Sequence, residues 1–167
     1  MRNVVLRVLI GALALAGMVV SVLALRVHYL DPNAAPPCAV NEHWDCGAVN
    51  HSRFAVFPPK SFDEDAGSKK VHVPVAAIGV AGYGLMALFA LAGRFRVVLP
   101  LAEMGFAAAC MLTYLEAFVL EKWCIYCVWS QGIVTAIVLA TIVALVLRRP
   151  AGRRLDAVKP AADRVAG

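Results

Sequence analysis

The amino-acid sequence predicts an all-α protein, an integral membrane four-helix bundle with a long extracytoplasmic loop between its first and second helices. Of its 167 residues, 61% are hydrophobic and only 16% are charged, and the mean hydropathy is +0.74. A soluble domain has about 45–50% apolar and about 25% charged residues, so the composition excludes a soluble monomer. The charged residues also lie mostly outside four long apolar stretches, and roughly 20 apolar residues suffice for a helix to cross the bilayer core.

These four stretches define the predicted spans. In chain order, they cover about residues 5–27, 73–93, 97–120 and 125–147. The first contains an uncharged run from Val8 to Leu25, which is longer than the roughly 7–15 apolar residues of a cleaved signal peptide. We therefore expect the first helix to be retained. The third stretch is equally long but carries Glu103 and Glu116.

Basic residues gather on one side of the predicted bundle, at both termini and in the turn between the second and third helices. They are Arg2, Arg7, Arg94, Arg96, Arg148, Arg149, Arg153, Arg154, Lys159 and Arg164. Because such residues accumulate on the cytoplasmic side of a membrane, we expect a multi-pass protein of the cell (inner) membrane with both termini in the cytoplasm. Segments 26–72 and 121–124 are then extracytoplasmic.

This topology also gives the domain organisation. Residues 1–150 form one membrane domain in contact with lipid, and 151–167 form a cytoplasmic tail. The net charge of +5 reflects the residues that flank the spans, and these form no single basic patch of the kind that binds nucleic acid. We therefore expect no nucleic-acid partner.

Four of the five cysteines lie on the predicted extracytoplasmic side, where disulfides are stable. Cys38 and Cys46 are in the long loop, and Cys124 and Cys127 form a C-x-x-C motif at the start of the last helix. A helix N-terminus and this spacing both favour the reactive thiolate. Two dithiols on one side of a bundle indicate a thiol–disulfide relay. Cys110, in the middle of the third helix, is interpreted as a packing residue.

Other interpretations of the cysteines remain open. Two structural disulfides would explain the even number, but a C-x-x-C bridge closes too short a loop to constrain the unfolded chain much. Cys38, His43, Cys46 and His51 are spaced like zinc ligands. A non-enzymatic metal-binding membrane sensor that uses this Cys/His loop is therefore the alternative function. In the relay interpretation we expect no bound metal.

A transporter built around the two acidic residues of the third span is a further option, but it leaves the four cysteines without a role. Glu116 lies eight residues before Cys124, at a depth where an acid is a functional candidate by default. One interpretation is a proton relay. We favour a carboxylate that reaches the interface or pairs with Lys122.

Two motifs carry a resemblance to a known family. The stretch from Cys38 to Phe54 has the pattern C-x7-C-x5-S-R-F, and the start of the last helix reads Phe118-Val119-Leu120-x3-Cys124-Ile125-x-Cys127. Together with the helix order, they resemble the bacterial homologues of vitamin K epoxide reductase over nearly the whole chain, from Val4 to Leu147. The resemblance implies a bundle of four membrane helices that passes electrons from protein thiols to a quinone, and so supports disulfide bond formation.

The resemblance also implies a role for each cysteine. Cys38 looks like the outer cysteine that exchanges with a soluble thioredoxin-fold thiol oxidase, here a separate protein. Cys46 looks like the cysteine that passes electrons on to Cys124. Cys127 looks like the one that reacts with the quinone, which would be ubiquinone or menaquinone.

A quinone is apolar and has two carbonyl groups, so its pocket needs an apolar wall and one or two hydrogen-bond donors. Ser52 matches the family's serine near this pocket, and Gln131 can also donate. On a helical plot Phe54 shares one arc with Cys46 and Val49, which would let it cover the pocket. The alternative is a short irregular loop in which these apolar residues occur by chance. Vertebrate members have an asparagine and a tyrosine where this chain has Val75 and Gln131, which argues against vitamin K epoxide as the substrate.

Overall fold

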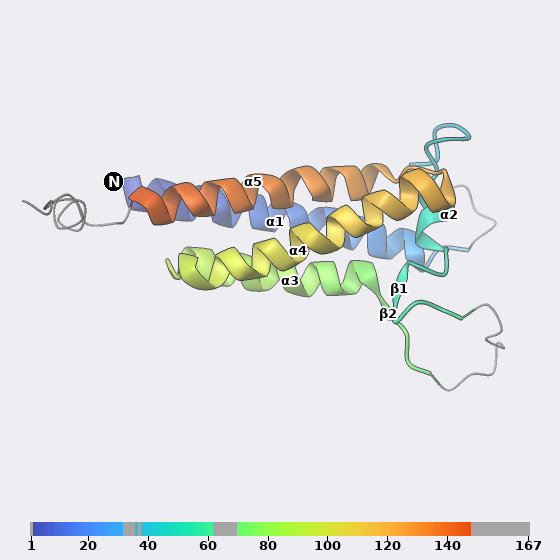
Figure 1. Cartoon of the computed structure of the whole chain (residues 1–167), viewed down its shortest axis with the longest axis horizontal. Coiled ribbons are helices and arrows are strands. Elements are labelled where there is room, and N and C mark those ends of the chain that lie inside the picture. Colours follow the sequence, from blue (N-terminus) through green and yellow to red (C-terminus); the bar gives the residue numbers. More distant parts are fainter. Residues whose placement is uncertain (1, 32–35, 37, 62–69, 148–167) are drawn as a thin grey trace, which may run out of the picture.

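The computed structural model describes residues 2–31, 36, 38–61 and 70–147, and within them the chain is mostly helical (Figure 1). The elements are, in chain order, α1 (Arg2–His28), α2 (Cys46–Asn50), β1 (Val56–Phe57), β2 (Val73–Pro74), α3 (Val75–Leu91), α4 (Phe95–Leu115), the π-helical turn η1 (Glu116–Leu120) and α5 (Ile125–Leu147). The predicted helical character is confirmed. The predicted tail, 151–167, lies outside the described residues.

The long helices α1, α3, α4 and α5 run along the long axis of the molecule, and α2 and the two short strands gather at one end of them (Figure 1). Helix α1 packs against α3 and α5, and α4 packs against α3 and α5. The N-terminal end of α1 lies beside the C-terminal end of α5, at the end opposite α2 (Figure 1). The segment between α1 and α3 therefore covers one end of the helices, together with the start of α5.

Three of the expected spans are long and apolar enough to cross a membrane, namely Val4–His28, Phe95–Leu120 and Ile125–Leu147. The expected second span is shorter than predicted, because α3 has 17 residues. Its start follows Pro74, which lacks an N–H and is extended, and the chain turns after it at Gly93, whose φ is +73°. The outer faces of the helices are apolar, as a membrane requires: the exposed fraction is 62% for Leu88 and 72% for Met104.

Small residues allow α1 and α3 to lie close together. A Cβ atom at Gly79 of α3 would lie 2.8 Å from Ser21 Oγ of α1, closer than atoms can approach without a shift. On α1, the ring of Tyr83 occupies the space that a side chain at Gly17 would need. The backbones can approach here because these glycines present no side chain to the neighbouring helix.

The buried residues form two clusters. The larger one fills the space between the four long helices and includes Ile10, Tyr83, Phe95 and Ile137. The second lies where the segment after α1 meets the start of α5. Its members are Val27, Cys38, Cys46, Val49 and Cys124. The fold thus buries cysteines from both predicted pairs in one small core at the end of the bundle.

Candidate functional site

Backbone hydrogen bonds hold the loop before α2 against the segment before α5. The Trp123 N–H donates to the His43 carbonyl at 2.7 Å, and the Asp45 N–H donates to the Trp123 carbonyl at 3.0 Å. The indole rings of Trp44 and Trp123 lie 6.2 Å apart, and the Lys122 ammonium donates to the Glu42 carbonyl. This pairing places the start of α2, with Cys46, beside the start of α5, with Cys124.

Helix α2 is only a little over one turn long, and its N-terminus is capped. The Asp45 carboxylate accepts a hydrogen bond from the Ala48 N–H at 3.0 Å, which satisfies one of the N–H groups that a helix start leaves free. The helix ends after Asn50, so Cys46 and Phe54 do not share one helix as the helical plot assumed. The His51 ring lies against the carbonyls of Gly47 and Leu30, and the chain continues from there in turns.

Cys38 and Cys46 form a disulfide whose Cα atoms are 5.8 Å apart. Cys46 begins α2 and has no exposed surface, whereas Cys38, in the loop, retains an exposed fraction of 6%. Both cysteines are thus buried, and Cys38 retains the small exposed surface of this pair. The two loop cysteines that were expected to form a pair are thus joined in one disulfide.

Cys124 and Cys127 are free thiols. Cys124 immediately precedes α5 and is fully buried. A hydrogen bond with the Cys127 side chain lowers the pKa of Cys124 below the usual value for a thiol, an effect that burial partly opposes. A lowered pKa increases the fraction of thiolate, which is the form that attacks disulfides.

Asn50 joins the two cysteine pairs. Its side-chain nitrogen donates to the Cys46 carbonyl at 2.8 Å and lies 3.6 Å from the Cys124 sulfur. The Asn50 carbonyl accepts a hydrogen bond from His28 Nδ1 at 2.6 Å, so the end of α1 holds this residue from the other side. Asn50 is not among the site residues predicted from the sequence. The available signal was its position one helical turn after Cys46, on the same face of a short helix.

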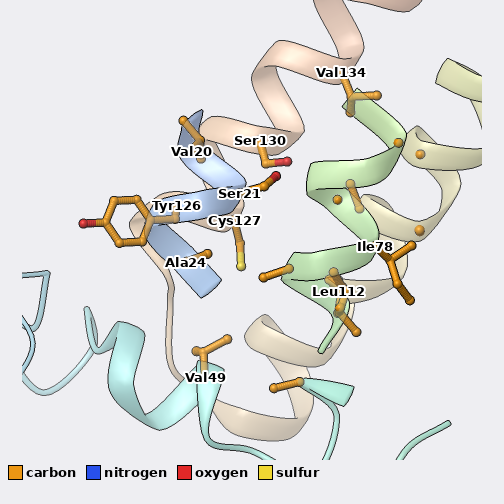
Figure 2. A pocket seen from close by; sticks show the side chains of 18 of the residues that line it. Val20, Ser21, Ala24, Val49, Ile78, Leu112, Tyr126, Cys127, Ser130 and Val134 are labelled. Carbon is orange, nitrogen blue, oxygen red and sulfur yellow. The ribbon is translucent and has the colours of Figure 1, made fainter. Parts of the chain in front are cut away.

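A cavity of about 370 Å³ lies between the long helices next to the C-x-x-C motif. The Cys127 sulfur points into it, between α1 and α3 (Figure 2). Its wall is mostly apolar, and its polar members are Ser21, Asn50, Ser52, Tyr83, Glu116, Tyr126, Cys127 and Ser130. Neither Cys124 nor Gln131 is among the residues that line it. The C-x-x-C motif therefore presents one sulfur to the cavity and keeps the other in the cysteine core.

Of the three residues predicted for a quinone pocket, two line this cavity and one does not. Ser52 and Phe54 line it, and the Arg53 guanidinium lies 5.3 Å from the centre of the Phe54 ring. Gln131 instead approaches Cys110 of α4, with 3.5 Å between its side-chain nitrogen and the sulfur. Ser130 takes the place on α5 that was expected for Gln131. Its hydroxyl and carbonyl oxygens both lie 2.9 Å from the Tyr83 hydroxyl.

Glu116 does not reach the interface or pair with Lys122 through its side chain, as the sequence analysis had favoured. It is 2% exposed and lines the cavity. Its Oε2 accepts a hydrogen bond from the Cys124 N–H at 3.0 Å. The π-helical turn that begins at Glu116, followed by Glu121 with φ of +51°, reverses the chain so that the carboxyl faces the start of α5.

The histidines near the loop contact backbone oxygens. His28 bonds to the Asn50 carbonyl, and both ring nitrogens of His51 lie within 3.0 Å of carbonyl oxygens. Within the described residues, no group of three or more His, Cys, Asp or Glu side chains is placed to bind a metal. The metal-sensor interpretation thus gains no support from this geometry.

The fold and the site define a helical membrane protein with two neighbouring cysteine pairs, one of which opens onto an apolar cavity. The vitamin K epoxide reductase family matches residues 8–143, and the chain belongs to that family. The family indicated by the two cysteine motifs is therefore confirmed. The family is one of membrane-bound oxidoreductases that use quinones. A search of curated proteins found no match to this chain.

Proposed function

We propose that this protein is a membrane thiol:quinone oxidoreductase that passes electrons from an extracytoplasmic thiol protein through its two cysteine pairs to a quinone. The observation that carries the proposal is the placement of the four cysteines. Cys38, Cys46 and Cys124 share one buried core, in which Cys38 is slightly more exposed than Cys46, and Cys127 faces the cavity. The order along this path matches the order that a relay needs.

The path follows ordinary thiol–disulfide exchange. A partner dithiol reduces the Cys38–Cys46 disulfide and is itself oxidised. The Cys46 thiolate then attacks a Cys124–Cys127 disulfide at Cys124, which releases the Cys127 thiolate. Attack by Cys38 on Cys46 restores the first disulfide and frees Cys124. One turn of this cycle leaves Cys38 and Cys46 joined and Cys124 and Cys127 as thiols, ready to reduce the acceptor.

The residues around the cavity fit a quinone. A quinone takes two electrons and two protons from a dithiol, and its ring is apolar apart from two carbonyl oxygens. The mostly apolar wall would hold the ring, and Ser52, which lines the cavity, would donate to a carbonyl. Phe54 would cover the ring from the segment after α2. Whether the natural acceptor is ubiquinone or menaquinone depends on the membrane that holds the protein.

The proposed topology is a bundle of four spans with both termini in the cytoplasm of a cell (inner) membrane. Helix α3 would be the shortest span, about 26 Å long at 1.5 Å per residue, which lies at the lower end of what crosses a bilayer core. The cysteine pairs and the loop then lie on the extracytoplasmic side. The proposed electron donor is a separate soluble protein with a thioredoxin fold that oxidises thiols.

Quinone reduction by the purified protein tests this function. The protein in lipid nanodiscs, supplied with a small dithiol and a short-chain quinone, should consume the quinone, as followed by its ultraviolet absorbance. Cys124→Ala and Cys127→Ala should abolish this activity. Cys110→Ala, which removes the thiol on the outer face of α4, is the matched control and should leave it unchanged. Equal turnover in the wild type and the Cys127 variant would refute the proposal.

A second pair of variants tests the order of the relay. Cys38→Ala and Cys46→Ala should lose turnover with a reduced thioredoxin-fold protein as donor, because these variants have no outer disulfide for the donor to attack. With a small dithiol that reaches the inner pair through the cavity, the same variants should retain turnover. Loss with both donors would mean that the outer pair is required for more than exchange with a protein.

A further inference from the structure

Glu116 combines three properties that its neighbours do not share. It is the only Asp, Glu, Lys, Arg or His among the described residues that line the cavity. It is almost fully buried, and its Oε2 accepts the Cys124 N–H. Its other oxygen, Oε1, has no hydrogen-bond partner among the described residues. A carboxylate with one oxygen in a hydrogen bond and the other without a partner can accept a proton on the second oxygen.

The position of Glu116 relative to the thiols gives that proton a source. Glu116 and Cys127 line the same cavity, and the Glu116 carboxyl also accepts a hydrogen bond from the N–H of Cys124, the other cysteine of the C-x-x-C motif. A negative charge beside a thiol opposes formation of the thiolate. The charge conflict is relieved if the proton that leaves the sulfur moves to the carboxylate.

The remaining titratable groups around the cavity are tyrosines. Tyr83 of α3 is bonded to Ser130, and the Tyr126 ring points away from the cavity side chains shown with it (Figure 2). Helix α1 and the segment after α2 present only apolar and neutral polar side chains to the cavity. Among the described residues, Glu116 is thus the group best placed to exchange protons with Cys127.

We propose that Glu116 is the proton-transfer residue of the quinone-reducing step, which deepens the function proposed above and rests on it. The Glu116 carboxylate takes the proton of the Cys127 thiol and then gives it to the reduced acceptor, so that it returns to its charged form. Cys124 supplies the second proton. Oxidation of the dithiol thus yields one disulfide, two electrons and two protons, and the quinone that receives them becomes a quinol.

A purely structural role for Glu116 makes different predictions. In that role the carboxyl would only accept the Cys124 N–H at the start of α5, and an amide oxygen can do the same. Glu116→Gln keeps the size and this acceptor but removes the site for the proton. The matched control is Glu103→Gln, which changes an exposed carboxyl on the same helix.

The first measurement is quinone reduction as a function of pH. General acid–base groups commonly contribute 10²- to 10⁴-fold, so Glu116→Gln should slow quinone reduction roughly 100-fold or more and remove one limb of the pH profile. Glu116→Asp should restore part of the rate, and Glu103→Gln should match the wild type. An unchanged rate and profile in Glu116→Gln would overturn the Glu116 proposal while leaving the proposed function standing.

The second measurement needs no quinone. In a Cys110→Ala background, mass spectrometry follows alkylation of Cys127 by a small maleimide at several pH values. Removal of the neighbouring negative charge should make Cys127 react faster in Glu116→Gln at a given pH, even though quinone reduction becomes slower. Equal alkylation rates with and without the carboxylate would show that Glu116 does not act on Cys127. If the wild type itself reduces no quinone, the proposed function and this inference fail together.

Discussion

The side-chain nitrogen of Asn50 lies 3.6 Å from the Cys124 sulfur, although the two residues are 74 positions apart in the sequence. The same nitrogen donates to the Cys46 carbonyl. One neutral amide therefore touches the backbone of the outer pair and the sulfur of the inner pair. This contact is the only side-chain hydrogen bond from the segment after α1 to Cys124 that the described structure contains.

Asn50→Ala should slow electron transfer from the Cys38/Cys46 pair to the Cys124–Cys127 disulfide. A hydrogen bond to a charged group contributes about 1.5–3 kcal/mol, so loss of this bond to the Cys124 thiolate should slow the exchange about 10- to 100-fold. Rapid acid quenching followed by thiol labelling measures the step. Reduction of quinone by a pre-reduced inner pair should change less. An equal loss in both measurements would place Asn50 in the quinone site instead.

Filling the cavity should block quinone reduction without unfolding the protein. A Cβ at Gly82 of α3 would have no atom within 4 Å, and Gly82 lines the cavity. Gly82→Leu should therefore raise the KM for quinone at least tenfold. Gly132 of α5 is equally open but lies outside the cavity wall, so Gly132→Leu is the matched control. Similar kinetics for the two variants would show that the quinone binds elsewhere.

The thiolate of Cys124 should form at lower pH than that of an ordinary cysteine, whose pKa is about 8.5. The bond with the Cys127 side chain is the largest cause of the lowered pKa. In a Cys110→Ala background with the outer disulfide intact, Cys127→Ala removes this partner and should raise the pKa of Cys124. Cys127→Ser retains a hydroxyl donor and should keep it lower. Thiolate absorbance near 240 nm during a pH titration measures both, and an identical midpoint in the two variants would contradict the assignment.

Tyr83→Phe should destabilise the packing of α3 on α5. It removes the hydroxyl that lies 2.9 Å from both the Ser130 hydroxyl and the Ser130 carbonyl. Loss of buried hydrogen bonds of this kind lowers the free energy of unfolding by about 1–2 kcal/mol. Thermal unfolding in detergent tests this, with Tyr114→Phe, on the exposed face of α4, as the control. A larger loss for Tyr114→Phe would be the opposite of what we expect.

The sequence was sufficient for the features that depend on local pattern. Hydropathy located three helices that are long and apolar enough to cross a membrane, and the spacing of the loop cysteines indicated a pair that the structure joins in a disulfide. The predicted second span, 73–93, is longer than α3. The apolar residues on either side of α3 do not continue the helix past Pro74 and Gly93. Composition alone could not reveal these ends, since hydropathy does not report backbone conformation.

The contacts across the site could not be predicted in this way, because they depend on how far each helix is rotated. Gln131 and Ser130 lie four and three residues after Cys127, so either one is placed near it on α5. The cavity lies on the Ser130 side. Likewise, Lys122 was expected to pair with Glu116, but its ammonium bonds to the Glu42 carbonyl, because the π-helical turn directs the carboxyl toward the start of α5.

The full burial of Cys46 and Cys124 limits which molecules can react with their sulfurs. In the proposed relay, a small thiol or dissolved oxygen that reached these sulfurs would divert electrons before they reached the quinone. Because Cys46 and Cys124 have no exposed surface, molecules in solution would not react with their sulfurs during the proposed exchange. In the proposed relay, specificity would then depend on which thiol donor reacts with Cys38 and which acceptor reacts with Cys127.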